Sequence, residues 1–298
     1  MVQRPRWQPA LAVAQVLSRV LVGSHRKSAR RRDAATSGLR GGLILASMSV
    51  MPDPSAYRER TSAVAGVTVW TRVADGSSSW ILPDGCIDVL WNGSELTVAG
   101  PDTTAHRASA TNGTRYAALR FASGLAPTVL GVAADGLRDQ RPSLADVIGA
   151  VDTDRLAVSL LATDDPSSQL ERWAGRRLAH AGGRDRTMCH VAALIGDGRT
   201  VAEVAAQVGY SERQLNRRSL ASFGYGPKML ARVLRLQRAM GSARGGMSLV
   251  EASLAAGYGD QAHFAHEVRA LTGQTASQLV GSGANRSTPL PSGSRNVA

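Results

Sequence analysis

A thiol and two carboxylates lie close together in the segment "ILPDGCIDVLW" (residues 81–91), where Asp84 and Asp88 flank Cys86. With His106 farther along, such a group could bind a metal, sense redox state or accept an alkyl group. A single cysteine offers no chelate, however, and neighbouring carboxylates raise a thiol pKa rather than lower it. We therefore favour a buried strand cysteine after a Pro-Asp-Gly turn, with Asp84 hydrogen-bonded to the turn backbone. No metal site, cofactor or enzymatic activity is expected.

Arginine and amide side chains gather in a second segment, "VGYSERQLNRR" (residues 208–218). Guanidinium groups pair with phosphates and with guanine, and amide groups pair with adenine, so this composition suits a nucleic-acid-binding surface. The alternative is an ordinary solvated helix face. One helix of this composition does not decide between the two interpretations.

The elements around the second segment form a helix, a tight turn and another helix. Apolar residues recur at one-face helical spacing, namely Val201, Val204, Ala205 and Val208. Gly209 is suited to the left-handed conformation that ends a helix. Ser211 and Gln214 form a capping box that starts the next helix. On that helix we expect Leu215 and Ser219 to face inward, with Ser222 and Phe223 continuing the same face, and Arg213, Asn216 and Arg217 to face outward.

The same pattern occurs again 48 residues later. Leu249, Ala252, Ser253 and Ala256 repeat the apolar positions, and Gly257-Tyr258 repeats Gly209-Tyr210. After the second turn there is one extra residue, so that Phe264 corresponds to Leu215. Such a duplication makes chance similarity a poor explanation and favours two helix-turn-helix units.

A third helix is predicted between the two copies, in "GPKMLARVLRLQRAM" (residues 226–240). Pro227 suits its first position, and Met229, Val233, Leu236 and Met240 form its apolar stripe. Residues 212–244 hold eight basic residues and one acidic residue. A one-signed array of this kind favours contacts with phosphates.

Residues 187–280 resemble the DNA-binding domain of the AraC/XylS family of transcriptional regulators. The resemblance lies in "VAEVAAQVGYSERQLNRR", in the Gly-Tyr pair of both units, in "DQAHF" after the second turn and in "LTGQT" near the end. It implies two helix-turn-helix units joined by a linker helix, with one recognition helix in each of two adjacent major-groove segments. Ser219 departs from the family, which usually has a bulky apolar residue there. The packing of the first unit therefore depends on whether Phe223 fills the gap.

The resemblance and the side-chain chemistry together nominate DNA-contacting residues. On the recognition helices we expect contacts with base edges or nearby phosphates from Arg213, Gln214, Asn216, Arg217, Gln261, Ala262, His263 and His266. On the linker helix, Lys228, Arg232 and Arg235 are expected either to contact phosphates or to support the helix.

The N-terminal half has a different pattern. Short β-branched and aromatic runs separated by turn residues predict antiparallel strands over residues 67–122, with a type I′ hairpin at Asn92-Gly93, and helices over 127–180. "WILPDGCIDVLWNG" resembles a β-rich domain of uncharacterised function that precedes the DNA-binding domain of some actinobacterial AraC-like regulators. That resemblance implies an effector-sensing or dimerising role. Trp70, Trp80 and Trp91 are expected to be core residues, although an apolar effector pocket that includes them stays open.

The fold class is therefore α+β in two domains, a β-rich sandwich or barrel with accessory helices and an all-α double helix-turn-helix. We place a basic, disordered extension at 1–50, the sensor or dimerisation domain at 51–180, a linker at 181–186, the DNA-binding domain at 187–280 and a disordered tail at 281–298. A weaker alternative for the extension is an arm that contacts DNA phosphates.

The charge distribution separates the same regions. The net charge of +12 divides into +8 over residues 1–50, −3 over 51–180 and +7 over 181–298. A localised basic region is expected to bind a polyanion. Two cysteines and no long apolar run fit a cytoplasmic protein without a membrane span.

We thus predict a sequence-specific transcriptional regulator that is a monomer or homodimer. Double-stranded DNA and an unknown small-molecule effector are the expected partners, and RNA polymerase is a further candidate. Two alternatives remain, an alkyl acceptor or redox sensor that works through Cys86 and a non-specific basic DNA-coating protein.

Overall fold

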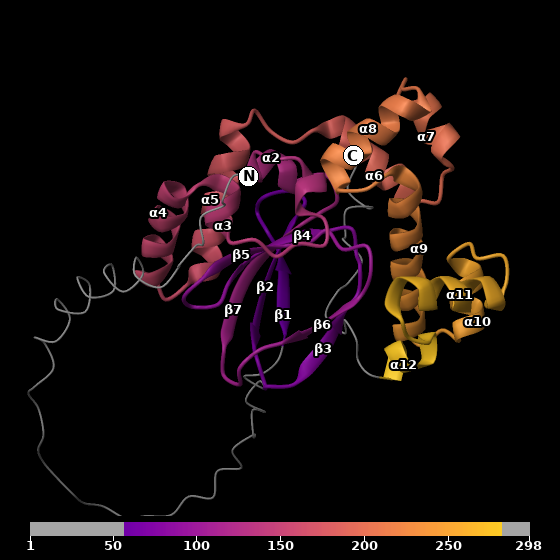
Figure 1. Cartoon of the computed structure of the whole chain (residues 1–298), viewed down its shortest axis with the longest axis horizontal. Coiled ribbons are helices and arrows are strands. Elements are labelled where there is room, and N and C mark those ends of the chain that lie inside the picture. The colour runs from indigo at the N-terminus through magenta and orange to yellow at the C-terminus, as the bar shows by residue number, and fades with distance from the viewer. Residues whose placement is uncertain (1–56, 282–298) are drawn as a thin grey trace, which may run out of the picture. The chain divides into compact units, whose positions relative to one another are not determined.

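A computed structural model describes residues 57–281, which form a β-rich region followed by helices (Figure 1). The expected α+β class is confirmed. The predicted extension at 1–50 and all but the first residue of the predicted tail at 281–298 lie outside the described residues.

Five antiparallel strands form the main sheet in the order β1-β2-β7-β4-β5, and two further strands pair as a ribbon, β3-β6. The strands of the main sheet are β1 (Arg58–Thr61), β2 (Val67–Val73), β7 (Arg115–Phe121), β4 (Ile87–Trp91) and β5 (Leu96–Ala99). The ribbon consists of β3 (Ser78–Ile81) and β6 (His106–Ser109). The central strand β7 has seven residues in register with β2 and five with β4, from Val67↔Phe121 to Trp91↔Ala117.

The hairpin predicted at Asn92-Gly93 joins β4 to β5, but the type I′ turn is wrong. Trp91 pairs with Leu96, so four residues form the loop. Gly93 has a positive φ of 97°, whereas Asn92 does not. Instead, Asn92 Oδ1 accepts hydrogen bonds from the backbone N–H groups of Ser94 and Glu95, at 3.0 and 2.8 Å. The side chain of Asn92 therefore organises a longer turn.

The two faces of the main sheet have different surroundings because side chains alternate along each strand. One face, which includes Val69, Val89 and Leu119, is buried against helices α2 (Ala126–Leu130), α3 (Leu144–Ile148), α4 (Ala150–Leu161) and α5 (Pro166–His180). A 3₁₀ helix, η1 (Ala134–Leu137), also contributes to this core. The opposite face carries polar and aromatic side chains. The first face thus supplies the hydrophobic core, and the second face is not part of that core.

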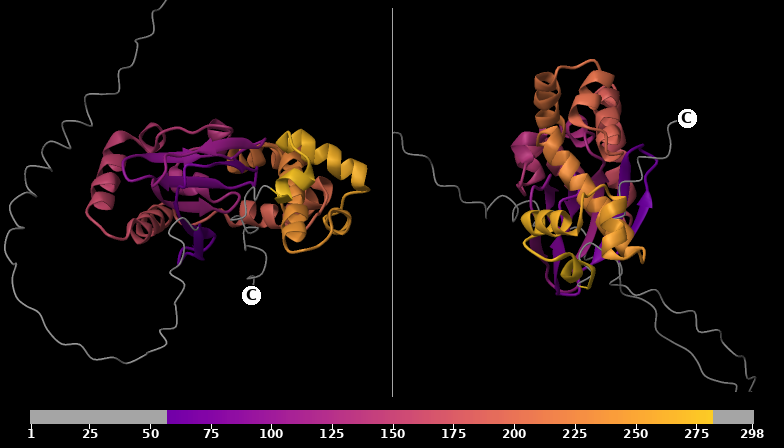
Figure 2. Two further views of the ribbon diagram at one scale, coloured as in Figure 1. Left: turned by 90° about the horizontal axis from the view of Figure 1, so that it is seen from below. Right: turned by 90° about the vertical axis from the view of Figure 1, so that its right-hand side faces the viewer.

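Seven helices follow in the remaining described residues, up to residue 281. They are α6 (Arg186–Gly196), α7 (Val201–Gln207), α8 (Glu212–Phe223), α9 (Pro227–Arg244), α10 (Leu249–Ala255), α11 (Gln261–Thr272) and α12 (Ala276–Gly281). Two apolar clusters hold them together, one around α6, α7 and α8 and one around α10, α11 and α12. The long helix α9 contributes to both clusters, with Leu230 and Val233 in the first and Leu236 and Met240 in the second. Figure 2 shows the ribbon from two further sides.

Local sequence signals account for the ends of these helices. The capping box of Ser211 and Gln214 begins α8 as expected, and equivalent boxes begin α7 and α10. Asp260 begins α11 by accepting a hydrogen bond from the N–H of His263 at 2.7 Å. Gly209 and Gly257 both have positive φ, at 70° and 84°. Each turn can therefore reverse the chain without steric strain.

The unusual residue of the first unit, Ser219, is completely buried. Its hydroxyl has no hydrogen-bond partner among the described residues, whereas the corresponding position of the second unit holds the buried, apolar Val268. Phe223 is also buried, in the same apolar cluster as Leu215. One turn farther along α8, the ring of Phe223 supplies apolar volume that serine lacks.

Candidate DNA-binding surface and a pocket in the sheet region

The outer face of α8 exposes two arginines. Arg213 and Arg217 are both exposed, and neither makes a hydrogen bond or ion pair within residues 57–281. The buried face of the same helix holds Leu215 and Phe223 in the core. The capping box and this apolar face fix α8, so both guanidinium groups are presented to solvent by a rigid element. They can bind phosphate or guanine without first breaking an internal contact.

The two amide side chains nominated on α8 are already engaged. Gln214 Oε1 accepts hydrogen bonds from Ser211 N and Oγ, at 2.9 and 3.0 Å. Asn216 Oδ1 lies against the α8–α9 turn, where a Cβ at Gly226 would approach it to 2.5 Å. Both residues therefore help to shape the helix and its turn.

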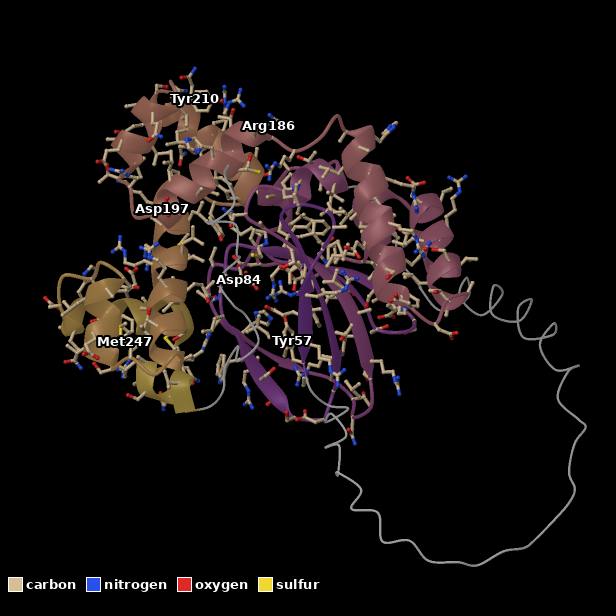
Figure 3. All side chains as sticks on the ribbon, turned by 180° about the vertical axis from the view of Figure 1, so that it is seen from behind. Tyr57, Asp84, Arg186, Asp197, Tyr210 and Met247 are labelled. Atoms are coloured by element: carbon tan, nitrogen blue, oxygen red, sulfur yellow. The ribbon has the colours of Figure 1, made fainter. Side chains whose placement is uncertain are left out.

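Arg218 was missed by the sequence interpretation. Its guanidinium lies 4.9 Å from the centroid of the Tyr210 ring, an arrangement typical of a cation–π contact. Tyr210 is labelled in Figure 3. Tyr210 belongs to the Gly-Tyr pair of the first turn. That pair was the available signal, because the half-buried ring of the turn tyrosine can be covered by a side chain from the following helix.

Helix α11, the second helix expected to read DNA, exposes Gln261, Ala262 and His266. His263 is more constrained, because its ring packs edge-on against Tyr258 with centroids 5.3 Å apart. Its Nε2 also lies 4.0 Å from Glu267 Oε2. Gln261 and His266 are thus available for polar contacts, and His263 also helps to position the helix.

The basic residues of α9 divide into two groups. Lys228 is exposed near the helix start. Arg232 Nε lies 3.4 Å from Glu267 Oε2, and Arg235 lies over the Tyr258 ring at 5.4 Å. Arg238, outside the nominated set, donates to Ala256 O at 3.2 Å. Arg232 and Arg235 therefore contact the second unit directly, which is the supporting role that the sequence interpretation left open.

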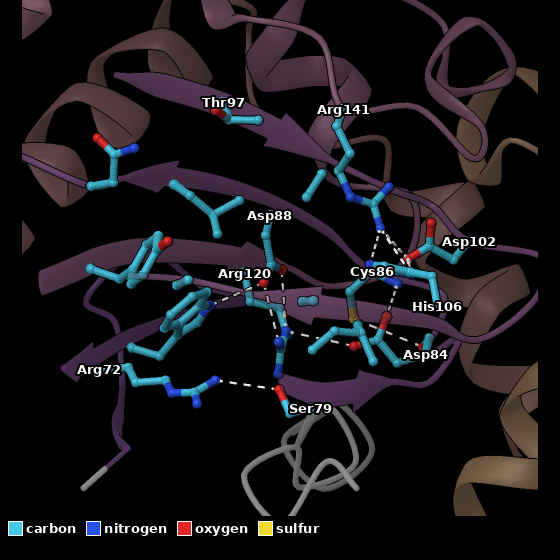
Figure 4. A pocket seen from close by; sticks show the side chains of 18 of the residues that line it. Arg72, Ser79, Asp84, Cys86, Asp88, Thr97, Asp102, His106, Arg120 and Arg141 are labelled. Carbon is cyan, nitrogen blue, oxygen red and sulfur yellow. Dashed lines mark hydrogen bonds and ion pairs between the residues drawn. The ribbon is translucent and has the colours of Figure 1, made fainter. Parts of the chain in front are cut away.

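A cavity of about 580 Å³ lies in the β-rich region, between the main sheet and the β3-β6 ribbon (Figure 4). Near its centre, Arg120 Nε and Nη2 donate to Asp88 Oδ1 and Oδ2, each at 3.1 Å. Asp84 Oδ2 lies 3.6 Å from the same guanidinium, and Trp70 Nε1 donates to Asp88 Oδ2 at 3.0 Å. Fork geometry and low exposure make this a strongly organised ionic cluster.

Cys86 lies in the wall of the cavity with a buried side chain. Asp84 Oδ1 accepts a hydrogen bond from Cys86 N at 2.9 Å, the contact expected for the Pro-Asp-Gly turn. Burial raises the pKa of the Cys86 thiol well above its usual value, and the charge of Asp84 raises it further. The thiol is therefore protonated at neutral pH. Within the described residues, no group of three or more His, Cys, Asp or Glu side chains is placed to bind a metal.

The three nominated tryptophans are placed differently. Trp70 and Trp80 line the cavity, whereas Trp91 belongs to the hydrophobic core on the other face of the sheet. Alternation along β4 explains the difference, since Asp88 and Leu90 face the cavity while Val89 and Trp91 face the helices.

The turn that carries Asp84 and Cys86 packs against the helical region (Figure 3). Gln237 Nε2 on α9 donates to Pro83 O at 2.7 Å. Gly85 has a φ of 79°, and a Cβ there would lie 3.3 Å from Leu230 Cδ1 and 2.9 Å from Ser123 Oγ. Leu82 is part of the apolar cluster around α10, α11 and α12. One wall of the cavity is therefore directly connected to the linker helix.

The end of α8 makes a second close contact with the β-rich region. Gly224 ends α8 with a φ of 80°, and a Cβ there would lie 2.5 Å from Pro101 Cγ and 3.0 Å from Ala134 O. Arg138 Nη1 donates to Gly224 O at 3.1 Å. Only glycine allows both the helix end and this close approach.

Two family models match the chain. A helix-turn-helix domain model matches residues 204–281, and a model of a domain of unknown function, DUF6597, matches residues 66–143. The chain thus combines an AraC-type helix-turn-helix domain with a DUF6597 domain. The helix-turn-helix match supports a DNA-binding transcriptional regulator, and the two matches confirm the resemblance stated for each half.

Comparison with solved structures gives distant similarities. An apo variant of ToxT from Vibrio cholerae is 9% identical with a TM-score of 0.39, over 74% of this chain and 99% of that chain. A second ToxT structure from V. cholerae is 7% identical with a TM-score of 0.39, over 76% and 96%. No curated protein sequence matches the chain. Over residues 57–281, no helix combines the length and apolarity required to cross a membrane.

Proposed function

We propose that the protein binds a specific DNA sequence through α8 and α11, which enter adjacent segments of the major groove. The observation that carries the proposal is the pair of exposed, unpartnered guanidinium groups of Arg213 and Arg217 on a helix whose other face is fixed in the core. The family match supports the same use of the second unit. A sequence-specific contact of this kind contributes about 1–3 kcal/mol of discrimination.

We assign each nominated residue a role in DNA binding according to its contacts. Arg213, Arg217, Gln261 and His266 contact base edges or adjacent phosphates, and the methyl group of Ala262 suits the methyl group of thymine. Lys228 contacts a phosphate. Gln214, Asn216, His263, Arg232 and Arg235 hold the recognition helices in position, with any contact to DNA coming from their remaining polar atoms.

The β-rich region is proposed to regulate this binding by sensing a small molecule or by forming a homodimer. The support for sensing is a cavity of about 580 Å³, a volume typical of small-molecule sites, whose wall contacts α9. A ligand that shifts residues 83–86 would act on the helix that joins both units. Recruitment or occlusion of RNA polymerase is the expected consequence for transcription.

Selection of sites from a randomised DNA library tests the proposal, with the full chain at fixed salt. Arg217→Ala should relax the recovered motif within the half-site bound by α8. Arg155→Ala, on the exposed surface of α4, removes the same charge and should leave the motif unchanged. Uniform recovery of sequences by the wild-type protein would instead identify a non-specific DNA-coating protein.

A further inference from the structure

The wall of the cavity in the β-rich region is unusually polar for a sheet face that is covered by other strands. The floor of the cavity is the face of the main sheet that does not contact the helices, where Trp70, Leu90, Thr97 and Arg120 lie. The cross-strand register places Asp88 directly opposite Arg120, and Leu90 opposite Thr97. A sheet face that only needed to exclude water would be filled by apolar side chains. Here the polar groups converge on a space that can hold a ligand.

The buried charges at the cavity each have a partner of opposite sign. Arg120 is paired with both Asp84 and Asp88, as described above. Arg141 Nη2 donates to Asp102 Oδ2 at 2.7 Å. Arg72 donates to Ser79 Oγ at 3.4 Å and lies 3.6 Å from Asp75. Glu95 is exposed at the rim, where water screens its charge.

A charged ligand would therefore meet an unfavourable site. An anion at Arg120 would compete with two carboxylates, and a cation at Asp88 would compete with a bidentate guanidinium. In either case one buried ion would lose its partner, and an unpaired buried charge is strongly destabilising. The paired charges can still orient a neutral dipole.

Hydrogen-bonding groups and rings remain available to such a neutral molecule. Arg120 Nη1, Tyr116 Oη and Thr97 Oγ1 line the cavity and make no hydrogen bond to any described residue. Trp70, with Tyr57 stacked at 5.6 Å on its ring, provides a rigid aromatic wall. Aromatic walls with a few fixed polar groups favour a flat ring that carries a hydrogen-bonding substituent.

We propose that this cavity binds an uncharged, ring-bearing small molecule whose hydrogen-bond acceptor faces the free Nη1 of Arg120. The inference rests on the sensing role proposed above and specifies the class of ligand for that site. The ionic cluster acts as a preorganised polar patch. The aromatic side chains supply most of the contact area.

Matched probes of different charge test the ligand class. Indole-3-acetamide, indole-3-acetate and tryptamine share one ring and are neutral, anionic and cationic. Phenylacetamide, phenylacetate and phenethylamine form a second series. Titration calorimetry with the full chain should give one site for each amide, with at least about tenfold tighter binding than for its charged relatives.

A cavity-filling variant tests the location. Ala108 lines the cavity from β6, so Ala108→Leu should weaken binding of both amides by at least about tenfold without removing any charged group. Ala63→Leu adds the same side chain at an exposed position outside the cavity and should bind as the wild type does. If Ala108→Leu does not unfold cooperatively, the test uses Ala99→Val instead. This substitution on β5 fills less of the cavity.

Three results would overturn the ligand class: tighter binding of an acetate or amine, no binding of any probe, or unaltered amide binding by a folded cavity-filling variant. DNA selection with the same preparation separates this inference from the proposed function. A recovered motif without probe binding rejects the ligand class alone. Probe binding without a motif rejects sequence-specific regulation.

Discussion

The side-chain amide of Gln237, near the middle of linker helix α9, donates a 2.7 Å hydrogen bond to the main-chain oxygen of Pro83. Both partners are buried. Because Pro83 precedes Asp84 in the cavity wall, this bond links the wall of the cavity to the helix that joins the two helix-turn-helix units.

Replacing Gln237 should therefore destabilise the folded chain. Gln237→Leu leaves the Pro83 carbonyl buried without its donor, at an expected cost of about 1–3 kcal/mol in the free energy of unfolding. Denaturant unfolding measures this cost. Gln207→Leu, on the exposed surface of α7, is the control and should change stability by less than about 0.5 kcal/mol. Equal stability of the two variants would contradict the role of the bond.

Lys228 and Arg235 should respond differently to removal of their charge. Lys228→Ala should lower the slope of log affinity against log salt by about one unit, because one phosphate contact is lost. Arg235→Ala should mainly lower stability, since its guanidinium packs on Tyr258. Salt titrations of DNA binding and thermal unfolding of both variants distinguish the two effects. An unchanged salt slope for Lys228→Ala would remove that residue from the DNA-binding surface.

Glu171 makes stability depend on pH. Hydrogen bonds from Arg60, together with those from Ser62 and Ala63, lower the pKa of Glu171 from its ordinary value of 4.5 to about 2. Because the folded state holds the carboxylate form, this stabilisation is fully present above about pH 4.5 and is lost as the pH falls toward 2.

The variant Glu171→Gln should cost about 1–2 kcal/mol at pH 7, and its difference from the wild type should shrink as the pH falls through this range. Unfolding curves at pH 7, 4 and 3 provide the measurement. Glu95→Gln, at an exposed carboxylate, should show no such convergence. A constant difference at all three pH values would show that the ionised carboxylate is not the stabilising group.

The thiol of Cys86 should react slowly in the folded protein. Burial raises the pKa of both cysteines, but Cys86 is fully buried whereas Cys189 is half-buried. We expect iodoacetamide at pH 7.5 to modify Cys86 at least about tenfold more slowly than Cys189, and both at similar rates in denaturant. Peptide mass spectrometry gives the two rates. Fast modification of Cys86 in the folded state would restore the alkyl-acceptor or redox interpretation.

The helical half could be predicted in detail because its signals are local. Ser211, Gln214 and Gly209 specify a helix end and a helix start within six residues, and the duplication of the pattern removes ambiguity. In the β-rich half, the strands from β2 to β7 were indicated by short β-branched and aromatic runs, whereas β1 lies before the predicted range. Its hairpin turn was mispredicted because the Asn92 side chain, rather than a pair of positive φ angles, organises the loop.

The cavity could not be predicted because it depends on register between distant strands. Asp88 was noted in the sequence, but Arg120 lies 32 residues away and its alignment with Asp88 requires the β4-β7 pairing. The same applies to Arg232 and Glu267, which are 35 residues apart. In the sequence, the basic stripe on α9 resembled a phosphate-binding array. Only the packing of α11 against α9 shows which of these basic side chains make contacts within the protein.

The close fit at Gly224 bears on how freely the two halves can be recombined. That residue ends the first recognition helix and also receives Pro101 and Ala134 of the β-rich half at distances that exclude any Cβ. A chimera that joins residues 187–281 to another sensor would lose this contact surface. Exchange of regulatory halves among such proteins therefore requires matched replacement on both sides of the junction, and Gly224 marks where the match must be made.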